Sequence, residues 1–428
     1  MSLTMRWAIG GGNTLESSRL EEGCVRYVRF LPRGPDDFPN IMCFKTRIHR
    51  SSRPEDASED QNAGRDAIDY IAVSYAWGDP TPKHQIFVDG EPRLIAENLW
   101  QFLRQAEEDT ELVSEWLWID ALSIDQTNAE ERRHQVGIMS RIFSDASEVY
   151  VWLGQSRDEG DAAMSVLSED SIQDYIYHQN RHLVRDSGST LSARVDYIKS
   201  TGDYIEWVAG VSKAIVSLCQ RPYWRRLWVF QELRHAVAIK IMCGEKCIHW
   251  ETFSKLWSVM AELSALNGDA AETLRGSLAT RMMTLRAKPI DFSLWNLLKE
   301  TRNLECLDDR DRVYALLSVA TQGHENIEAD YRPDVHPVEL ACHILCNKYA
   351  KRPPSSTDDQ SLDFEFLADV FRLSETDLFE HWHADGRARP ASGRLHRSGR
   401  LLDSLPSWSA WARYHGRLAV INRLQNNK

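Results

Sequence analysis

Hydrophobic and polar positions follow two alternating periods through the middle of the chain, which predicts strands separated by helices. YIAVSYAW, residues 70–77, is rich in β-branched and aromatic residues, as is typical of a buried strand. EWLWID at 115–120, EVYVWLG at 148–154 and AVAIKIMCG at 236–244 are further apolar runs of strand length. Because helical patterns lie between the strands, we predict a parallel sheet with right-handed crossovers.

The segments between these strands have the period of amphipathic helices. Residues 96–108 place four apolar side chains on one helical face: Leu99, Phe102, Leu103 and Ala106. Residues 128–146 offer Asn128 as an N-cap and then an apolar stripe: Val136, Met139, Ile142 and Phe143. IFVDGEP, residues 86–92, predicts a hairpin because Asp-Gly favours a tight turn.

Polar stretches predict three regions. Residues 51–66 are charged and turn-rich, so residues 1–68 are predicted to be an N-terminal extension and linker. An α/β domain then spans 69–250, with an insertion at about 155–220. Residues 251–428 carry the apolar spacing of packed helices and are predicted to form a mainly helical C-terminal region.

Composition narrows the possible partners and compartment. The 63 acidic and 51 basic residues give a net charge of -12, which argues against nucleic acid as a partner. The sequence has no signal peptide and no apolar run of membrane-spanning length, so we expect a soluble, cytoplasmic protein. Eight scattered cysteines without a CxxC pair predict reduced thiols. Pairs such as Cys243 and Cys247 are expected to be buried rather than metal-bound.

Polar side chains gather where the first two predicted strands end. They are Ser74, Tyr75, Trp77 and Asp79 after the first strand, and Asp120, Ser123 and Asp125 after the second. Because ligands of parallel α/β sheets bind at the carboxyl ends of the strands, these residues predict a binding site. The alternative is structural: Ser123 and Asp125 would cap loops, and Trp77 would pack under a helix.

Seven motifs occur in the order seen in fungal heterokaryon incompatibility (HET) domain proteins. They are SYAWGD, LWIDALSIDQTNAEERRHQV, FSDASEVYVWLG, RPYWRRLWVFQEL, DDRDRVYALLSVA, ADYRPDV and LPSW. The chain resembles that family from about Asp69 to Trp408. Family members commonly have cysteine in the second motif where this chain has Ser123, so a thiol nucleophile is missing at that position.

The HET family in turn resembles TIR domains, which have a flavodoxin-like parallel sheet and often cleave NAD at the nicotinamide–ribose bond. TIR domains carry a Trp-Cys-x-x-Glu-Leu pattern after their third strand, and its glutamate is catalytic. This chain has WVFQEL, residues 228–233, beyond its third predicted strand and the insertion. The resemblance therefore implies a TIR-like α/β fold and assigns the catalytic role to Glu232.

The residue types suit this chemistry. Nicotinamide departs as a neutral molecule, so the reaction needs a carboxylate that stabilises an oxocarbenium-like ribose. Expected ligand contacts are Trp77 or Tyr75 on a ring, Asp79, Asp120 or Asp125 on ribose hydroxyls, Ser74 and Ser123 at the strand ends, and Arg225 and Arg226 on phosphates. NAD is the expected substrate, and neither a cofactor nor a metal is expected.

Structural roles compete with the catalytic one. Glu232 sits in a predicted packed helix, where it would instead pair with a neighbouring arginine. Glu131 is a rival catalytic acid, although we expect it to stabilise the N-terminus of the helix that begins at Asn128. His134, without a paired ligand, is expected at the surface or in the core rather than at a metal.

Three functions follow from these alternatives. The first is an effector of self/non-self recognition and programmed cell death that hydrolyses NAD, a nucleotide ligand, after self-association or contact with a partner protein. The second is a non-enzymatic signalling and assembly module. The third is a HET fold recruited to a small-molecule reaction of secondary metabolism. We expect the first function.

Overall fold

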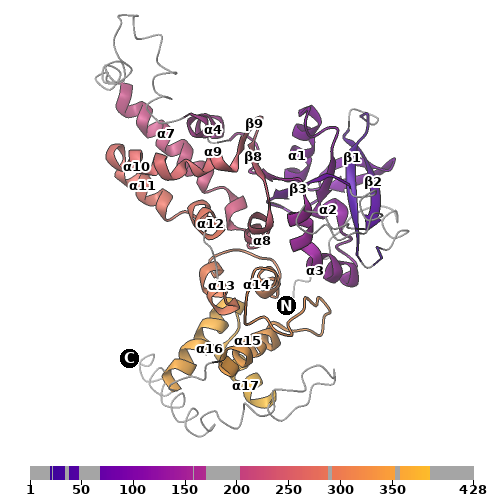
Figure 1. Cartoon of the computed structure of the whole chain (residues 1–428), viewed down its shortest axis with the longest axis vertical. Coiled ribbons are helices and arrows are strands. Elements are labelled where there is room, and N and C mark those ends of the chain that lie inside the picture. The colour runs from indigo at the N-terminus through magenta and orange to yellow at the C-terminus, as the bar shows by residue number, and fades with distance from the viewer. Residues whose placement is uncertain are drawn as a thin grey trace, which may run out of the picture. The chain divides into compact units, whose positions relative to one another are not determined.

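The computed structural model describes residues 20–21, 23–33, 38–47, 68–157, 159–169, 203–287, 292–351 and 357–385. The chain divides into two compact units, Met1–Pro289 and Ile290–Lys428 (Figure 1). The predicted linker, the middle of the predicted insertion and the LPSW motif lie outside the described residues.

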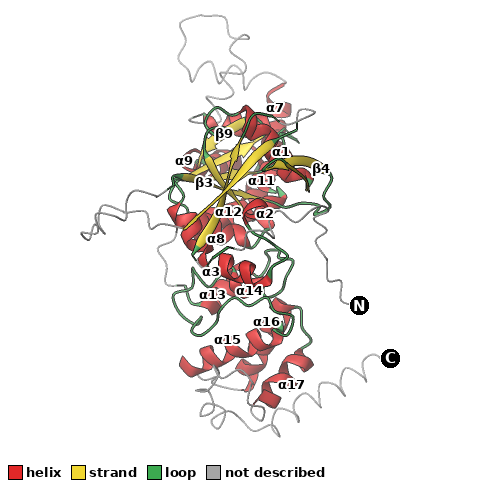
Figure 2. Cartoon of the chain, turned by 90° about the vertical axis from the view of Figure 1, so that its right-hand side faces the viewer, coloured by secondary structure: helices red, strands yellow, loops and turns green. Residues whose placement is uncertain are grey.

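Nine described strands form one sheet in the first unit. They are β1 (Cys24–Phe30), β2 (Asn40–Arg47), β3 (Tyr70–Tyr75), β4 (His84–Val88), β5 (Glu91–Ile95), β6 (Trp116–Ile119), β7 (Glu148–Trp152), β8 (Ile239–Cys243) and β9 (Lys246–His249). Their order is β5-β4-β2-β1-β6-β3-β7-β8-β9. The strands fan out around a common centre in Figure 2, because each strand is rotated from its neighbour by the usual twist.

The centre of this sheet is parallel, as the sequence predicts, but the whole sheet is mixed. The strands β6, β3, β7 and β8 run parallel to one another. Antiparallel pairs flank them: β1 with β6 and with β2, β4 with β5, and β8 with β9. The predicted hairpin is confirmed, since Asp89 and Gly90 at its tip both have a positive φ, as a two-residue turn requires.

The first two strands lie in the region that the sequence analysis treats as an extension. In β1, Val28 pairs with Leu117 of β6, which adds the N-terminal segment to the edge of the parallel strands. Every residue of β1 is buried or half-buried. This strand was not predicted, because two arginines interrupt its apolar residues and its pairing with β6 joins residues far apart in the chain.

Helices cover both faces of the sheet. On one face α1 (Glu97–Glu108) buries the four predicted apolar residues against the sheet. On the other face lies α3 (Ala129–Asp145), whose Phe143 packs edge-on against Trp118 with ring centroids 5.5 Å apart. The short α2 (Asp120–Ser123) follows β6 directly. Of the predicted α3 stripe, Val136 is only half-buried, while the other three residues are buried.

The rest of the first unit is helical. Its elements are α4 (Gly160–Ser168), α7 (Asp203–Cys219), the 3-10 helix η5 (Pro222–Arg225), α8 (Trp228–His235), α9 (Trp250–Ser254), α10 (Leu256–Leu266), α11 (Gly268–Arg275) and α12 (Leu278–Ala287). Because α9 contacts β8 and β9 and α12 contacts α8, this unit continues past residue 250, where the sequence analysis places a boundary.

The second unit has its own core. It contains α13 (Leu294–Thr301), α14 (Asp311–Tyr314), α15 (Pro337–Lys351), α16 (Thr357–Phe371) and α17 (Glu375–Asp385), and its described part has no β-strand longer than a single bridge. Buried Asp311 accepts a hydrogen bond from the Tyr331 hydroxyl at 2.6 Å, and Arg310 forms an ion pair with Asp308 at 2.8 Å, so the DDRDR motif contacts a loop and also contains an ion pair. No helix in the described ranges has both the length and the apolarity to cross a membrane.

Candidate functional site

Ser74, Tyr223 and Glu232 form a buried group at the carboxyl end of β3. The Ser74 hydroxyl donates to the Glu232 carboxylate, and its oxygen lies 2.8 Å from the Tyr223 hydroxyl. A serine has one proton to give, so when Glu232 is ionised Tyr223 must be the donor to Ser74. The three residues therefore form a directed chain of hydrogen bonds that ends on a carboxyl group.

The local sequence explains how Glu232 comes to be buried. Pro222 opens η5, where its fixed φ suits the first turn of a helix. After η5, α8 buries an unbroken run from Val229 to Leu233 against the sheet and the neighbouring helices. Since Ser74 and the α3-facing residues of β3 share one face of the sheet, α8 brings Glu232 directly to Ser74.

Burial dominates the electrostatics of Glu232. The side chain is 3% exposed, and burial raises the pKa of its carboxyl group to about 7. The Arg226 guanidinium and the Ser74 hydrogen bond work against this rise in pKa, while the charge of Asp120 adds to it. Near neutral pH the carboxyl group is therefore present in both protonation states.

Three half-buried side chains surround this centre, and we call Trp77, Asp120 and Arg226 the rim. The indole nitrogen of Trp77 donates to Asp120 Oδ2 at 2.7 Å, and the Arg226 guanidinium lies 3.9 Å from the same oxygen. Arg226 also donates to the Tyr75 carbonyl and lies over the Trp77 ring, 5.9 Å from its centroid. Burial raises the pKa of Asp120, an effect that Arg226 and the Trp77 hydrogen bond oppose. The rim thus combines an aromatic ring, an acid and a guanidinium.

The structure brings together six of the ten predicted site residues. They are Ser74, Tyr75, Trp77, Asp120, Arg226 and Glu232. Asp79 lies apart on the exposed loop after β3, where it accepts hydrogen bonds from Thr81 and Lys83. Arg225 is exposed on η5. The helical pairing with an arginine that competed for Glu232 is not what holds it, because its direct hydrogen bond is to Ser74.

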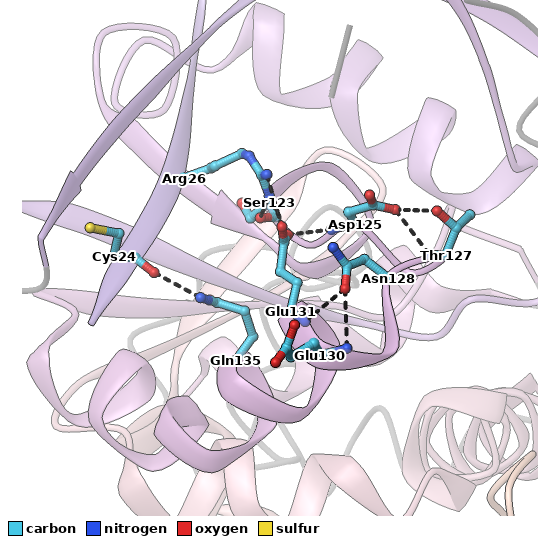
Figure 3. Close-up of polar contacts among 9 residues, drawn as sticks. All are labelled: Cys24, Arg26, Ser123, Asp125, Thr127, Asn128, Glu130, Glu131 and Gln135. Carbon is cyan, nitrogen blue, oxygen red and sulfur yellow. Dashed lines mark hydrogen bonds and ion pairs between the residues drawn. The ribbon is translucent and has the colours of Figure 1, made fainter. Parts of the chain in front are cut away.

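Ser123 and Asp125 belong to a second buried group (Figure 3). Its centre is an ion pair in which Arg26 of β1 contacts both carboxylate oxygens of Glu131 in α3. Arg26 also donates to the Ser123 carbonyl at 3.1 Å, and Glu131 accepts from the Asp125 amide at 2.7 Å. The Ser123 hydroxyl accepts from the Ile119 amide at 3.2 Å. These contacts give both predicted residues structural roles at the end of β6.

The second group also settles the roles of the α3 side chains. Asn128 is the predicted N-cap and accepts from the amides of Glu130 and Glu131. The Glu131 side chain, expected to stabilise the helix N-terminus, instead neutralises Arg26. His134 accepts a hydrogen bond from the Gly23 amide at 2.8 Å.

Sequence reasoning missed Tyr223 and Arg26. Tyr223 lies in the RPYW motif, and its position just before the helix of Glu232 was the feature that could have placed it near the site. Arg26 lies in CVRYVRF, where a cation between two residues typical of strands, Val25 and Tyr27, was the only signal.

In the described part of the chain, no three side chains among His, Cys, Asp and Glu are grouped so that they could hold a metal ion. Cys243 and Cys247 lie on β8 and β9, and only Cys243 is buried, so the prediction that both are buried is wrong for Cys247.

Comparisons with known proteins match part of this chain. A family model described as "Heterokaryon incompatibility protein (HET)" matches residues 70–232, from β3 to the site glutamate. The chain is 28% identical over 211 residues to "Heterokaryon incompatibility protein 6, OR allele" of Neurospora crassa. That alignment covers 45% of this chain and 31% of the Neurospora protein, so it spans about a third of the relative. No solved structure matches.

Proposed function

We propose that the chain is a heterokaryon incompatibility (HET) domain protein and that it acts in fungal self/non-self recognition. The family match over residues 70–232 and the name of the Neurospora relative support this role. The proposal includes programmed cell death as the outcome, a cytoplasmic location, and triggering by self-association or by a partner protein.

The arrangement of the central strands supports the finer proposal that the domain is TIR-like. Numbered along the chain, the four parallel strands lie in the order 2-1-3-4, which is the start of the flavodoxin-like order. Such sheets bind ligands at the carboxyl ends of their strands, which is where Ser74 and Asp120 lie.

NAD hydrolysis is the activity that we propose for the site. The observation that carries it is the placement of Glu232, a carboxyl group drawn into a buried centre at the end of β3 and hydrogen-bonded by Ser74. In the reaction the bond between the nicotinamide nitrogen and ribose C1′ breaks, and both electrons leave with nicotinamide. Water then adds to C1′ and releases a proton, giving ADP-ribose. The ionised Glu232 stabilises the positive charge on the ribose.

The rim supplies the binding groups for this reaction. The Trp77 ring would stack on an aromatic ring of the substrate, Asp120 would accept from ribose hydroxyls, and Arg226 would contact phosphate. Tyr223 positions Ser74, and Ser74 positions the carboxylate. Because Glu232 is 3% exposed, substrate can reach it only after neighbouring side chains move aside.

The same burial favours a second candidate, a signalling module that acts by assembly without turnover. Incubation of the purified protein with NAD at rising protein concentrations, with nicotinamide release followed by chromatography, separates the two candidates. The NAD proposal expects release that Asp120→Asn reduces at least about tenfold and Asp79→Asn leaves unchanged. Asp79 is the matched control, because it is a carboxylate on the same strand-end loop outside the group. Absence of nicotinamide release at every concentration would favour assembly.

The biological role is tested in fungal cells. Fusion of a strain that expresses the full chain with an otherwise identical strain that lacks it is expected to lower the viability of the fused cells. Unchanged viability in all fusions, with the protein present, would contradict the recognition proposal.

A further inference from the structure

Arg93 is a buried cation for which the described residues provide no hydrogen bond and no ion pair. It lies in the middle of β5, the edge strand of the sheet, opposite Ile86 of β4. The residue is only 8% exposed, and burial lowers the pKa of its guanidinium. Most of the side chain is thus buried, while the guanidinium offers five N–H donors and a positive charge that receive no acceptor from the described chain.

The acids near Arg93 are engaged by other groups. Asp89 accepts a hydrogen bond from the Cys43 amide at 2.8 Å. Asp125 accepts from both the amide and the hydroxyl of Thr127. The negative charges of both acids act on Arg93 without direct contact. They raise the pKa of its guanidinium, whereas burial lowers it.

Other cations lie on the same face of the sheet. Arg93 shares its face with Ile95, which belongs to the main core cluster, and this face continues to Cys43 and Arg26. Arg26 lies opposite Lys45 in the pairing of β1 with β2. Burial lowers the Lys45 pKa, and the positive charge of Arg26 lowers it further. Because Arg26 already holds Glu131, Arg93 is the member of this row that has donors to offer a ligand.

We propose that Arg93 is the anchor of a binding site for the phosphate group of a small molecule, on the face that β5 shares with β4, β2 and β1. A guanidinium offers a planar fork of donors that matches two phosphate oxygens, and a phosphate would neutralise the buried charge. The site is separate from the Glu232 group and does not depend on NAD hydrolysis. It lies partly on β1 and β2, outside the residues matched by the HET family.

Thermal unfolding of the full chain in sodium phosphate, compared with sodium chloride of equal ionic strength, tests this site. Phosphate is expected to raise the Tm of the parent protein in a saturable manner, because it binds the folded state. AMP is the second probe. A shift with both probes identifies the phosphate group as the ligand, and a shift with AMP alone identifies a nucleotide phosphate.

Arg93→Met is expected to abolish the saturable shift. In chloride this variant should unfold at the same temperature as the parent or higher, because it removes a buried charge that has no partner. Arg275→Met, which changes an exposed arginine of α11, is the matched control and should keep the shift. Asp125→Asn keeps an acceptor for Thr127 and removes a nearby negative charge, so it should lower the phosphate concentration at half-saturation.

Two results would overturn the proposal. One is a parent protein that responds identically to chloride, phosphate and AMP. The other is an Arg93→Met protein that retains the phosphate shift. If Arg93→Met does not fold, Arg93→Lys provides the test. Lysine keeps the positive charge but lacks the planar pair of donors, so the phosphate concentration at half-saturation should rise severalfold. An unchanged half-saturation in Arg93→Lys would also overturn it.

Discussion

Single residues determine the state of the site, and Glu232 is the one whose protonation decides what the site can do. Its pKa of about 7 means that the charge needed to stabilise a ribose cation is only partly present at neutral pH. A substrate phosphate bound to Arg226 would neutralise the positive charge that lowers the Glu232 pKa, so the carboxyl group would not ionise at a lower pH when substrate is bound. The proposed activity should therefore rise as pH increases through 7 and then level off.

The raised pKa also makes the stability of the protein depend on pH. The folded state keeps the Glu232 proton up to about pH 7, whereas the unfolded chain loses it near the ordinary value of 4.5. Stability from this group is therefore fully present below about pH 4.5 and is lost as pH rises through 7. Glu232→Gln, which keeps an acceptor for Ser74, should remove this loss, on the order of 3 kcal/mol.

The measurement is the Tm of variant and parent at about pH 4 and about pH 8. The two proteins should agree at the lower pH, and the variant should be the more stable one at the higher pH. Parallel curves at both values would mean that the Glu232 pKa is not raised in the folded protein.

Tyr223 has its effect through Ser74. Tyr223→Phe removes the donor to Ser74 and should destabilise the protein by about 1 kcal/mol. In a Ser74→Ala background the same change should have a much smaller effect, because its partner is already gone. The measurement is a double-mutant cycle of Tm values, and additive effects of the two substitutions would contradict the hydrogen-bond chain.

At the scale of elements, the sequence predicts what local patterns determine. The helices α1 and α3 follow from the period of their apolar residues, since each buries one face against the sheet. The strands β3, β6 and β7 follow from continuous apolar runs, and every residue of β3 is buried. The mixed edges of the sheet did not follow, because the pairing of β1 with β6 joins residues far apart in the chain. Long-range pairing leaves no periodic signal in a single sequence.

The candidate site, like the fold, was predicted only in part. Strand-end position identified Ser74 and Asp120, and the family resemblance identified Glu232. Ser123 was misplaced because α2 intervenes: one helical turn carries the chain away from Asp120, so Ser123 joins Arg26 instead. Nothing in the spacing of WIDALSIDQ shows which way that turn points.

The Arg26–Glu131 ion pair joins β1 to α3 and gives a prediction at this scale (Figure 3). Arg26→Met leaves the Glu131 carboxylate buried without its cation and should destabilise the protein by about 3–5 kcal/mol. The double variant Arg26→Met, Glu131→Leu should recover most of that loss, because no isolated charge remains. Thermal unfolding of the three proteins checks this, and a double variant as unstable as Arg26→Met would contradict it.

At the scale of the whole molecule, the first compact unit is larger than the family match. Arg286 of α12 donates to the Leu233 and Ala236 carbonyls at the end of α8, and it lies over the Trp250 ring at 5.6 Å. The helix that carries Glu232 is therefore held by residues well beyond 232, where the match ends.

This dependence predicts how truncated chains behave. A fragment of residues 1–289 should unfold cooperatively, since it retains the sheet and α12. A fragment of residues 1–250 should lack a cooperative transition and be cut rapidly by protease near α8, because the carbonyls at its end lose Arg286. Thermal unfolding and limited proteolysis measure both properties. Equal protease resistance of the two fragments would show that α9–α12 do not support the site.

The central claim is that the Glu232 carboxylate is the reacting centre of the site. The most direct measurement is nicotinamide release from NAD by the parent protein and by Glu232→Gln, at matched concentration and with folding checked by Tm. The account predicts release by the parent that increases through pH 7, and a loss of at least about a hundredfold in the variant. Equal rates in the two folded proteins would contradict it, since a carboxamide cannot supply the negative charge that the reaction requires.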